Sequence, residues 1–282
     1  MISSGLKYLH SDNAGDYIQS IAVEQFQTNV HRRFNRDTLG IVPDNKKKYL
    51  LITNGWFSHQ PEKCFPFSPC IVPLFFGFHI TDWNNSWSHF CSKKSLEYLL
   101  EHQPIGCRDR FTAYFLKKHG IETYYSKCLT LTFPKRNNIP KKTKYLIVDA
   151  NYLKIPGHIL GRSEYYTHSI PEKYPEKVKF DLARQLLNHY KEKATAVITS
   201  RLHCALPCLA MGIPVVFFGN KNNYRTSILT DLGIEIHSPA DIINWEKEIY
   251  NIDFNFIEKE KTSIITNLKH HMSSLYDRHS KK

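Results

Sequence analysis

The pattern of hydrophobic and polar positions is clearest in residues 194–219, where two apolar runs flank a polar break and a small-residue stretch. The runs at 194–199 and 214–218 are rich in β-branched or aromatic residues, as is typical of buried strands. The stretch 204–211 fits two turns of helix and ends at Gly212, a helix stop signal. Strand, helix and strand in this order predict a βαβ unit with parallel strands.

The same alternation of strand-like and helix-like segments extends along the chain. Strands are predicted at residues 6–9, 49–53, 71–79, 105–107, 124–133 and 145–150, and helices at 17–26, 92–102, 110–119, 177–192, 226–232, 239–249 and 256–276. Residues 59–70 contain three prolines and predict a loop, and residues 151–174 have no clear period and predict irregular structure. Alternating strands and helices indicate an α/β fold.

One segment has the composition of a linker. Residues 134–144, PKRNNIPKKTK, are basic, polar and broken by prolines. The predicted organisation is therefore an N-terminal α/β lobe over residues 1–133 and a C-terminal α/β lobe over residues 145–282.

Composition and charge limit the class of protein. Hydrophobic residues make up 41% of the 282 residues, which indicates a globular protein. Lys and Arg number 38 against 26 Asp and Glu, and a net charge of +12 favours anionic partners such as phosphates, nucleic acid or an acidic membrane face. The opening residues contain no apolar signal core, and no apolar run reaches membrane-spanning length. We therefore expect a cytoplasmic protein.

Cysteine spacing supports that expectation. The seven cysteines are odd in number and scattered. Free buried thiols in a reducing cytoplasm explain them better than disulfides do. No pair or cluster has the spacing of a structural zinc site, so no metal is predicted.

The polar break carries the candidate chemistry. Ser200, Arg201 and His203 lie where a strand ends and a helix begins, and ligands of open α/β sheets bind at that edge. The hydroxyl of Ser200 can cap the helix, a guanidinium fits phosphate or carboxylate, and an imidazole moves protons near neutral pH. We therefore expect an anionic substrate and acid–base chemistry here. The alternative is that Arg201 packs on the surface and His203 bonds a backbone carbonyl.

Three motifs resemble the polysaccharide pyruvyl transferase family. They are Ser-Arg-Leu-His at residues 200–203, followed by a small-residue helix and Gly-Ile-Pro-Val, Asn-Ala-Gly-Asp at 13–16, and Arg-Asp at 108–109. The resemblance implies two Rossmann-like lobes, similar to GT-B glycosyltransferases, with a cleft between them. It also implies a terminal helix that packs back on the first lobe. The implied donor is phosphoenolpyruvate, a co-substrate with no further cofactor, and the implied product is a sugar carrying ketal-linked pyruvate.

The resemblance and the chemistry of that donor assign candidate roles. The donor carries carboxylate and phosphate charges that suit two arginines, and its methylene carbon must be protonated. The candidates are His203 as general acid, Arg201 and Asp16 as further catalytic residues, Arg108, Arg201, His203 and Ser200 as donor-binding residues, and Asn13, Asn54 and His79 as acceptor-binding residues. For Asp16 the alternative is a helix cap, for Asn54 a place among buried aromatics, and for Arg108 a surface pair with Asp109.

Two other functions stay open. A GT-B-like glycosyltransferase would use a nucleotide sugar, but no carboxylate for a ribose occurs between Arg201 and Asp231. A basic polyanion-binding protein would use runs such as residues 46–48 and 141–144, but these are spread along the chain, 46–48 is most simply a solvated run, and no nucleic-acid motif occurs. The expected partners are phosphoenolpyruvate and a lipid-linked or nucleotide-linked saccharide acceptor, with peripheral contact at the anionic inner membrane face and no specific nucleic acid.

Overall fold

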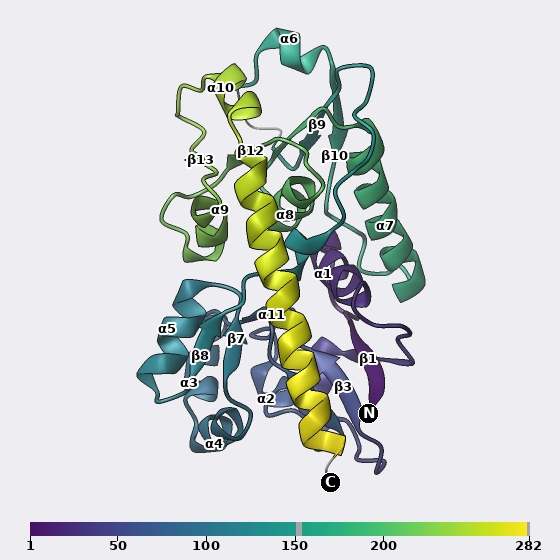
Figure 1. The fold of residues 1–282 in the computed structure, drawn as a ribbon, viewed down its shortest axis with the longest axis vertical. Coiled ribbons are helices and arrows are strands. Elements are labelled where there is room, and N and C mark those ends of the chain that lie inside the picture. Colours follow the sequence, from purple (N-terminus) through teal and green to yellow (C-terminus); the bar gives the residue numbers. More distant parts are fainter. Residues whose placement is uncertain (151–153, 281–282) are drawn as a thin grey trace. The chain divides into compact units, whose positions relative to one another are not determined.

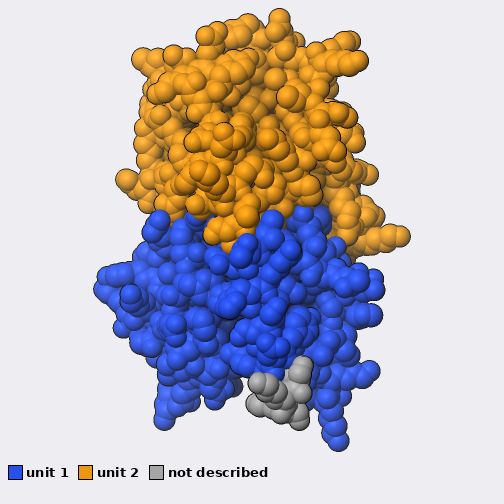
Figure 2. Space-filling view, in the orientation of Figure 1, with its two compact units in different colours: residues 1–9, 19–129, 264–282 blue, residues 10–18, 130–263 orange. Residues whose placement is uncertain are grey.

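The computed structural model describes residues 1–150 and 154–280 (Figure 1). The chain divides into two compact units, which Figure 2 colours separately. Unit 1 comprises residues 1–9, 19–129 and 264–280, and unit 2 comprises residues 10–18 and 130–263. Three parallel sheets confirm the predicted α/β class with Rossmann-like sheets. The two-lobed GT-B arrangement, its cleft and the linker at 134–144 stay predictions.

Unit 1 contains two four-stranded parallel sheets. The first has the order β2 (Arg32–Asn35), β1 (Ile2–Lys7), β3 (Tyr49–Ile52) and β5 (Ile71–Leu74), and the second has the order β4 (Gly55–Trp56), β6 (Phe78–His79), β7 (Ile105–Cys107) and β8 (Thr123–Tyr125). The single strand predicted at 71–79 is wrong, because the chain passes from one sheet to the other between β5 and β6. Gly77 makes that passage with φ +75°, and a Cβ there would lie 2.2 Å from Asn54 Oδ1.

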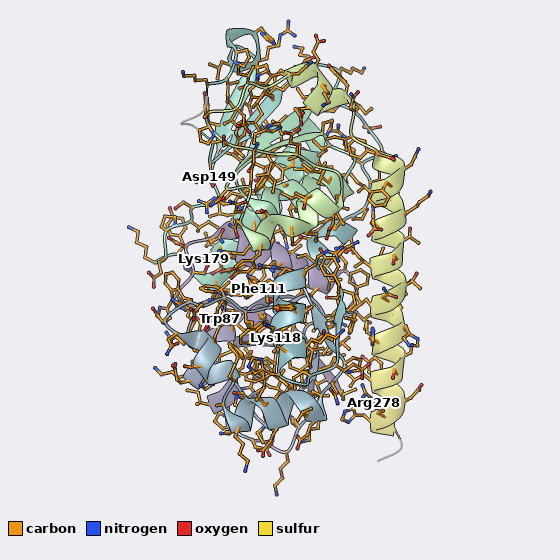
Figure 3. The ribbon with its side chains drawn as sticks, turned by 90° about the vertical axis from the view of Figure 1, so that its left-hand side faces the viewer. Trp87, Phe111, Lys118, Asp149, Lys179 and Arg278 are labelled. Carbon is orange, nitrogen blue, oxygen red and sulfur yellow. The ribbon has the colours of Figure 1, made fainter. Side chains whose placement is uncertain are left out.

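The helices of unit 1 are short, and two of them begin after a side-chain cap. They are α2 (Pro61–Cys64), α3 (Ser86–Phe90), α4 (Lys93–Glu101) and α5 (Arg110–Lys118), with a 3-10 helix at Arg36–Ile41, while α1 (Ala14–Glu24) begins in unit 2 and ends in unit 1. The Ser92 hydroxyl accepts the Ser95 N–H at 3.3 Å and starts α4. Trp87 of α3 stacks on Phe111 of α5 with ring centroids 5.3 Å apart (Figure 3). The helices predicted at 92–102 and 110–119 are therefore confirmed.

Unit 2 contains one five-stranded parallel sheet. Its order is β10 (Ser163–Tyr166), β9 (Tyr145–Val148), β11 (Ala196–Thr199), β12 (Val215–Phe218) and β13 (Ile236–His237), and its helices are α6 (Gly157–Leu160), α7 (Glu176–Lys193), α8 (Leu202–Ala210), α9 (Ser227–Asp231) and α10 (Trp245–Tyr250). Val197 of β11 pairs with Val215 of β12 in parallel register, which confirms the predicted βαβ unit. Ile147, Ile198 and Val216 are fully buried in the core of this unit.

Further predicted elements differ from the structure. The first strand runs over Ile2–Lys7 and not over residues 6–9, and α2 lies within the loop predicted at residues 59–70. The strand predicted at 124–133 ends early because Lys127 adopts φ +60°, and a 3-10 helix follows at Leu129–Thr132. The helix predicted at 239–249 begins late, because the Asn244 side chain accepts the Lys247 N–H and caps α10 there. Within the stretch predicted to be irregular, α6 and β10 form, and residues 151–153 lie outside the described residues.

The predicted C-terminal helix is α11 (Phe254–Ser280). In unit 2, Lys261 Nζ donates to the Ala210 carbonyl at 3.1 Å. In unit 1, the His271 ring stacks on Tyr124 with centroids 4.4 Å apart. None of the helices in residues 1–150 and 154–280 combines the length and apolar content of a membrane span. All seven cysteines are free, and only Cys91 is more than slightly exposed, as the sequence predicts.

Candidate functional site

The corner between β11 and α8 in unit 2 holds Ser200, Arg201 and His203. β11 is fully buried in the middle of the sheet, so the residues that follow it emerge at the carboxyl edge. Helix α8 begins after Arg201, which is its N-cap residue. The expectation that Ser200 caps this helix is wrong, because its hydroxyl donates to the Asp149 carbonyl at 2.8 Å instead.

Asp149 anchors the arginine of this corner, and sequence reasoning missed it. It follows β9, the strand beside β11, and its Oδ2 accepts Arg201 Nε at 2.7 Å and the His168 N–H at 2.9 Å. Burial alone would raise the pKa of Asp149, but the bonds from His168, Thr167 and Arg201 outweigh it and lower that pKa. The Asp149 carboxylate, labelled in Figure 3, therefore stays ionised and fixes the guanidinium. The Arg201 side chain is 43% exposed, so a ligand can still reach it.

His203 packs against the start of α1. A Cβ on Gly15 would lie 2.9 Å from His203 Nδ1, closer than real side chains approach, so only glycine fits beside this ring. The Gly15 N–H donates to Asn13 Oδ1 at 3.0 Å, which fixes the turn that brings the helix against the imidazole. The Asn-Ala-Gly-Asp motif and the Ser-Arg-Leu-His motif are therefore neighbours within unit 2.

The segment around Asn13 and Asp16 is held to the same edge by backbone contacts. The Ala14 N–H donates to the His168 carbonyl at 2.7 Å, and Asn13 forms an isolated bridge with Ser169. The Asp16 carboxylate is buried and accepts the Ser11 hydroxyl at 2.7 Å. Because His168 also donates to Asp149, one residue links the N-terminal motif to the carboxylate that holds Arg201.

Buried polar side chains hold His168 and the segment before Asp16 in place. His168 Nε2 lies 2.9 Å from the Tyr190 hydroxyl, and both side chains are almost fully buried. Burial raises the pKa of Tyr190 well above its ordinary value, so its hydroxyl stays protonated. Lys179, 1% exposed, donates to the Ser11 carbonyl at 3.0 Å and fixes the chain before Asp16.

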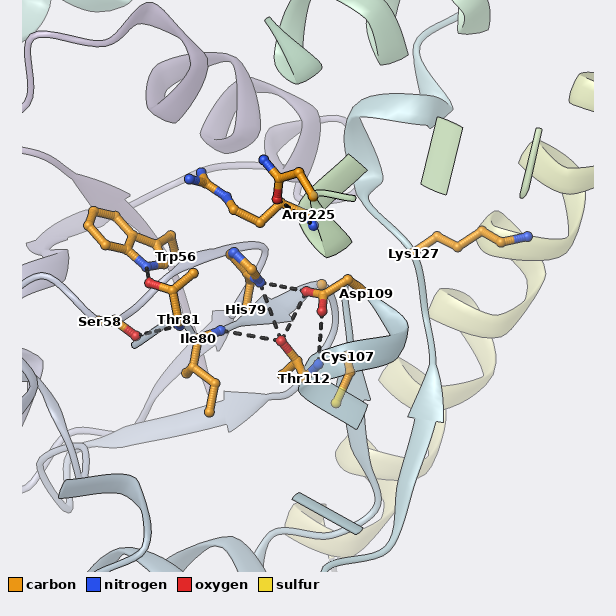
Figure 4. A network of polar contacts seen from close by, with 12 residues as sticks. Trp56, Ser58, His79, Ile80, Thr81, Cys107, Asp109, Thr112, Lys127 and Arg225 are labelled. Atoms are coloured by element: carbon orange, nitrogen blue, oxygen red, sulfur yellow. Dashed lines mark hydrogen bonds and ion pairs between the residues drawn. The ribbon is translucent and has the colours of Figure 1, made fainter. Parts of the chain in front are cut away.

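Unit 1 contains a second polar cluster, formed by His79, Asp109 and Thr112 (Figure 4). His79 Nδ1 lies 2.5 Å from Asp109 Oδ2 and 3.3 Å from the Thr112 hydroxyl. Burial opposes ionisation of Asp109, but His79 and Arg108 outweigh it and hold the pKa of this carboxyl at about 2. An imidazole held by a carboxylate through Nδ1 exchanges protons through Nε2, so the pair suits acid–base work.

Asp109 therefore pairs with His79 and not with Arg108 on the surface. Both Arg108 and Asp109 are 1% exposed, so the surface-pair alternative is wrong. The Asp109 carboxylate also caps α5 by accepting the Thr112 N–H at 2.8 Å. The histidine–aspartate pair was missed because the two residues come from different strand ends, and a carboxylate directly after Arg108 was its only signal.

Asn54 has a structural role in unit 1. Its Oδ1 accepts the Leu129 N–H at 3.0 Å, and its Nδ2 donates to the Gln19 carbonyl at 3.3 Å. The side chain is 1% exposed. Both ends of the amide are therefore used on backbone groups, which leaves little capacity for a ligand, and acceptor binding by Asn54 stays a prediction.

A group of metal-ligand type lies at the end of β13. One ligand atom from each of Glu235, His237 and Glu248 lies within 4.8 Å of the others. His237 Nε2 is 3.1 Å from Glu248 Oε2, so this histidine already has an ion-pair partner. The corner of Ser200, Arg201 and His203 does not involve these residues.

Comparison with known proteins agrees with the motifs of the corner. The model of the family described as polysaccharide pyruvyl transferase matches residues 13–222. A crystal structure of a functional uncharacterized protein from Klebsiella pneumoniae subsp. pneumoniae is similar with a TM-score of 0.48 and 12% identity, over 81% of this chain and 88% of that one. No curated protein matches the chain. The match spans most of the sequence and includes both motifs that meet in unit 2, and the chain therefore belongs to the polysaccharide pyruvyl transferase family.

Proposed function

We propose that the protein transfers the enolpyruvyl group of phosphoenolpyruvate to two hydroxyls of a sugar in a polysaccharide precursor, forming a pyruvate ketal. The observation that carries the proposal is the anchored arginine beside a histidine: Arg201, held by Asp149, and His203, packed on Gly15, at the carboxyl edge of the sheet in unit 2. A fixed guanidinium and a nearby imidazole supply anion binding and proton transfer together.

In the proposed reaction, Arg201 and Ser200 bind the anionic groups of the donor. His203 gives a proton to the methylene carbon, which becomes a methyl group, and one sugar hydroxyl attacks the resulting cationic carbon. A second sugar hydroxyl then displaces phosphate. Of the two hydroxyl protons lost by the sugar, one replaces the proton that His203 gave, and the other leaves with the phosphate. Asp16 is the candidate for the base that receives a hydroxyl proton.

The proposal also includes two candidate residues of unit 1, His79 and Arg108, whose roles are tested separately. His79, oriented by Asp109 at 2.5 Å, has the chemistry of an acceptor-side base, and Arg108 that of a second donor clamp. For R108A we expect a higher KM for phosphoenolpyruvate. Unchanged KM and kcat in R108A would remove Arg108 from the donor site.

The experiment measures thermal stabilisation by phosphoenolpyruvate and by a panel of nucleotide sugars. A ligand at about 100 times its Kd stabilises a protein by about 2.7 kcal/mol, which is readily measured. We expect phosphoenolpyruvate to stabilise the wild type but not R201A, and we expect H203A to bind the donor more weakly and to release no phosphate. R184A is the matched control, because Arg184 lies on α7 with a side chain that is 44% exposed and pairs with the exposed Asp181 at 3.3 Å.

The outcomes separate the candidate functions. Stabilisation by a nucleotide sugar, with none from phosphoenolpyruvate, would favour a glycosyltransferase. Salt-sensitive binding of nucleic acid without donor binding would favour a polyanion-binding protein. The acceptor we propose is a lipid-linked or nucleotide-linked saccharide at the cytoplasmic face of the membrane, and vesicles of anionic lipid test the peripheral contact.

A further inference from the structure

Unit 1 contains a hollow of about 780 Å³ at the amino-terminal ends of its first sheet. Ile2, Arg32 and Tyr49 line it, and they are the first residues of β1, β2 and β3. Figure 1 labels β1, β3 and the helix α11, whose residues Met272 and Tyr276 form another part of the lining. The volume lies within the range of about 300–1,000 Å³ that small-molecule sites occupy.

The charges around the hollow are of one sign. Arg32 and Lys47 line it together with His31, and among residues 1–150 and 154–280 no Asp or Glu does. Among residues 1–150 and 154–280, no ion pair includes Arg32 or Lys47, whereas Arg33 pairs with Glu24 at 2.6 Å. Two cations that line one hollow repel each other, and a bound anion replaces this repulsion with attraction to both of them. The hollow is therefore suited to an anionic ligand.

Aromatic rings hold the arginine of the hollow in place. The guanidinium carbon of Arg32 lies 4.7 Å from the centroid of Phe34 and 5.4 Å from that of Tyr49. Arg32 Nη1 also donates to the Tyr49 hydroxyl at 3.4 Å. A stacked guanidinium loses less conformational freedom when a ligand binds, so Arg32 is prepared for an anion.

The remaining lining offers both flat apolar and hydrogen-bonding groups. Phe26 and Tyr276 supply rings, and Gln27, Thr28 and Asn29 supply amides and a hydroxyl. Rings pack against the apolar faces of a cyclic ligand, while amides donate to and accept from its hydroxyls. A bare inorganic anion has no apolar face for the rings, whereas a sugar that carries an acidic group can pack on a ring and bond to the polar groups.

We propose that the hollow binds an anionic saccharide, a sugar unit that carries a carboxylate or a phosphate, with Arg32 and Lys47 on the anion. The anionic character follows from the side chains themselves. The choice of a saccharide rests on the proposed function, because the substrate of that function is a polysaccharide precursor. The hollow is an accessory binding site at the edge of the first sheet opposite to the strand ends where ligands of α/β sheets react.

Isothermal titration of the full chain tests this proposal with four probes. Trigalacturonate carries carboxylates, glucose 1-phosphate carries a phosphate, maltotriose is neutral and inorganic phosphate has no sugar. We expect one or both anionic sugars to bind, and the one that binds more tightly identifies the source of the anion. R32A and K47A should weaken that binding by about tenfold each, the loss typical of one charged contact. K48A is the matched control, because it removes the same charge as K47A. The Lys48 side chain donates to the Pro69 carbonyl at 2.8 Å and does not line the hollow.

Several results would overturn the inference. These are no binding of either anionic sugar at about 10 mM, equal binding of maltotriose, binding of inorganic phosphate as tight as that of the sugars, or equal weakening in K47A and K48A. If R32A does not fold, R32K keeps the charge without the planar fork and should still weaken binding, while K47A provides the second measurement.

R201A separates this inference from the proposed function. It should lose donor stabilisation while it binds the anionic sugar as the wild type does. If the wild type binds the saccharide but not phosphoenolpyruvate, the proposed function is wrong and the proposal for the hollow stands. Donor binding without saccharide binding would defeat the hollow alone.

Discussion

The carboxylate of Asp149 sets the position of Arg201, and replacing it with asparagine tests the proposed donor site. Asn is the appropriate replacement because residue 149 adopts φ +53°, a left-handed conformation that asparagine tolerates better than alanine. D149N keeps the shape and one carbonyl acceptor but removes the negative charge that binds Arg201 Nε at 2.7 Å. We expect the guanidinium to lose its fixed direction while the fold remains intact.

The magnitude follows from the exposure of the pair. The Asp149 side chain is 17% exposed and that of Arg201 is 43% exposed, so solvent screens part of the attraction. A charged hydrogen bond in that setting contributes about 1–2 kcal/mol. A loss of this size lowers kcat/KM for phosphoenolpyruvate by about 5- to 30-fold.

The assay is steady-state phosphate release at saturating acceptor, and D181N is the control. Asp181 forms the exposed pair with Arg184 at 3.3 Å, so its replacement removes the same charge away from the corner. D149N in an R201A background should cause no further loss, because Asp149 acts through Arg201. Wild-type kcat/KM in D149N, or a full additional loss in the double variant, would refute this role of Asp149.

Three further changes test other parts of the structure. G15A places a Cβ 2.9 Å from His203 Nδ1, so we expect a loss of transfer and a destabilisation of about 1–3 kcal/mol, measured by denaturation, whereas G157A, which meets nothing within 4 Å, should stay within about 0.5 kcal/mol. The pKa of Asp109 is about 2 against 3.8 for a free carboxyl, so its charge adds about 2 kcal/mol above about pH 4 that is lost as the pH falls to about 2. Unfolding of D109N should lack that acid dependence, and an unchanged pH profile would contradict the pair. N54A should destabilise unit 1 by about 1–3 kcal/mol, since it removes two buried hydrogen bonds, and an unchanged denaturation midpoint would argue against the structural role.

Local sequence determined the elements whose signals come from neighbouring residues. The apolar runs and the stop at Gly212 predicted β11, α8 and β12, and the helical patterns at 92–102 and 110–119 predicted α4 and α5. The corner with Arg201 and His203 was found in the same way, since it requires only a strand followed by a helix. Periodicity and capping involve residues within a few positions of one another, so a single sequence contains them.

The tertiary structure alone decided which of these residues meet. Asp149 is 52 residues from Arg201 and reaches it only because β9 pairs with β11 in the sheet. His79 and Asp109 are 30 residues apart and join through the pairing of β6 with β7. The division of residues 71–79 between two sheets and the hollow at Arg32 likewise depend on strand order. Strand order results from burial summed over a whole unit, and no local pattern of residues specifies it.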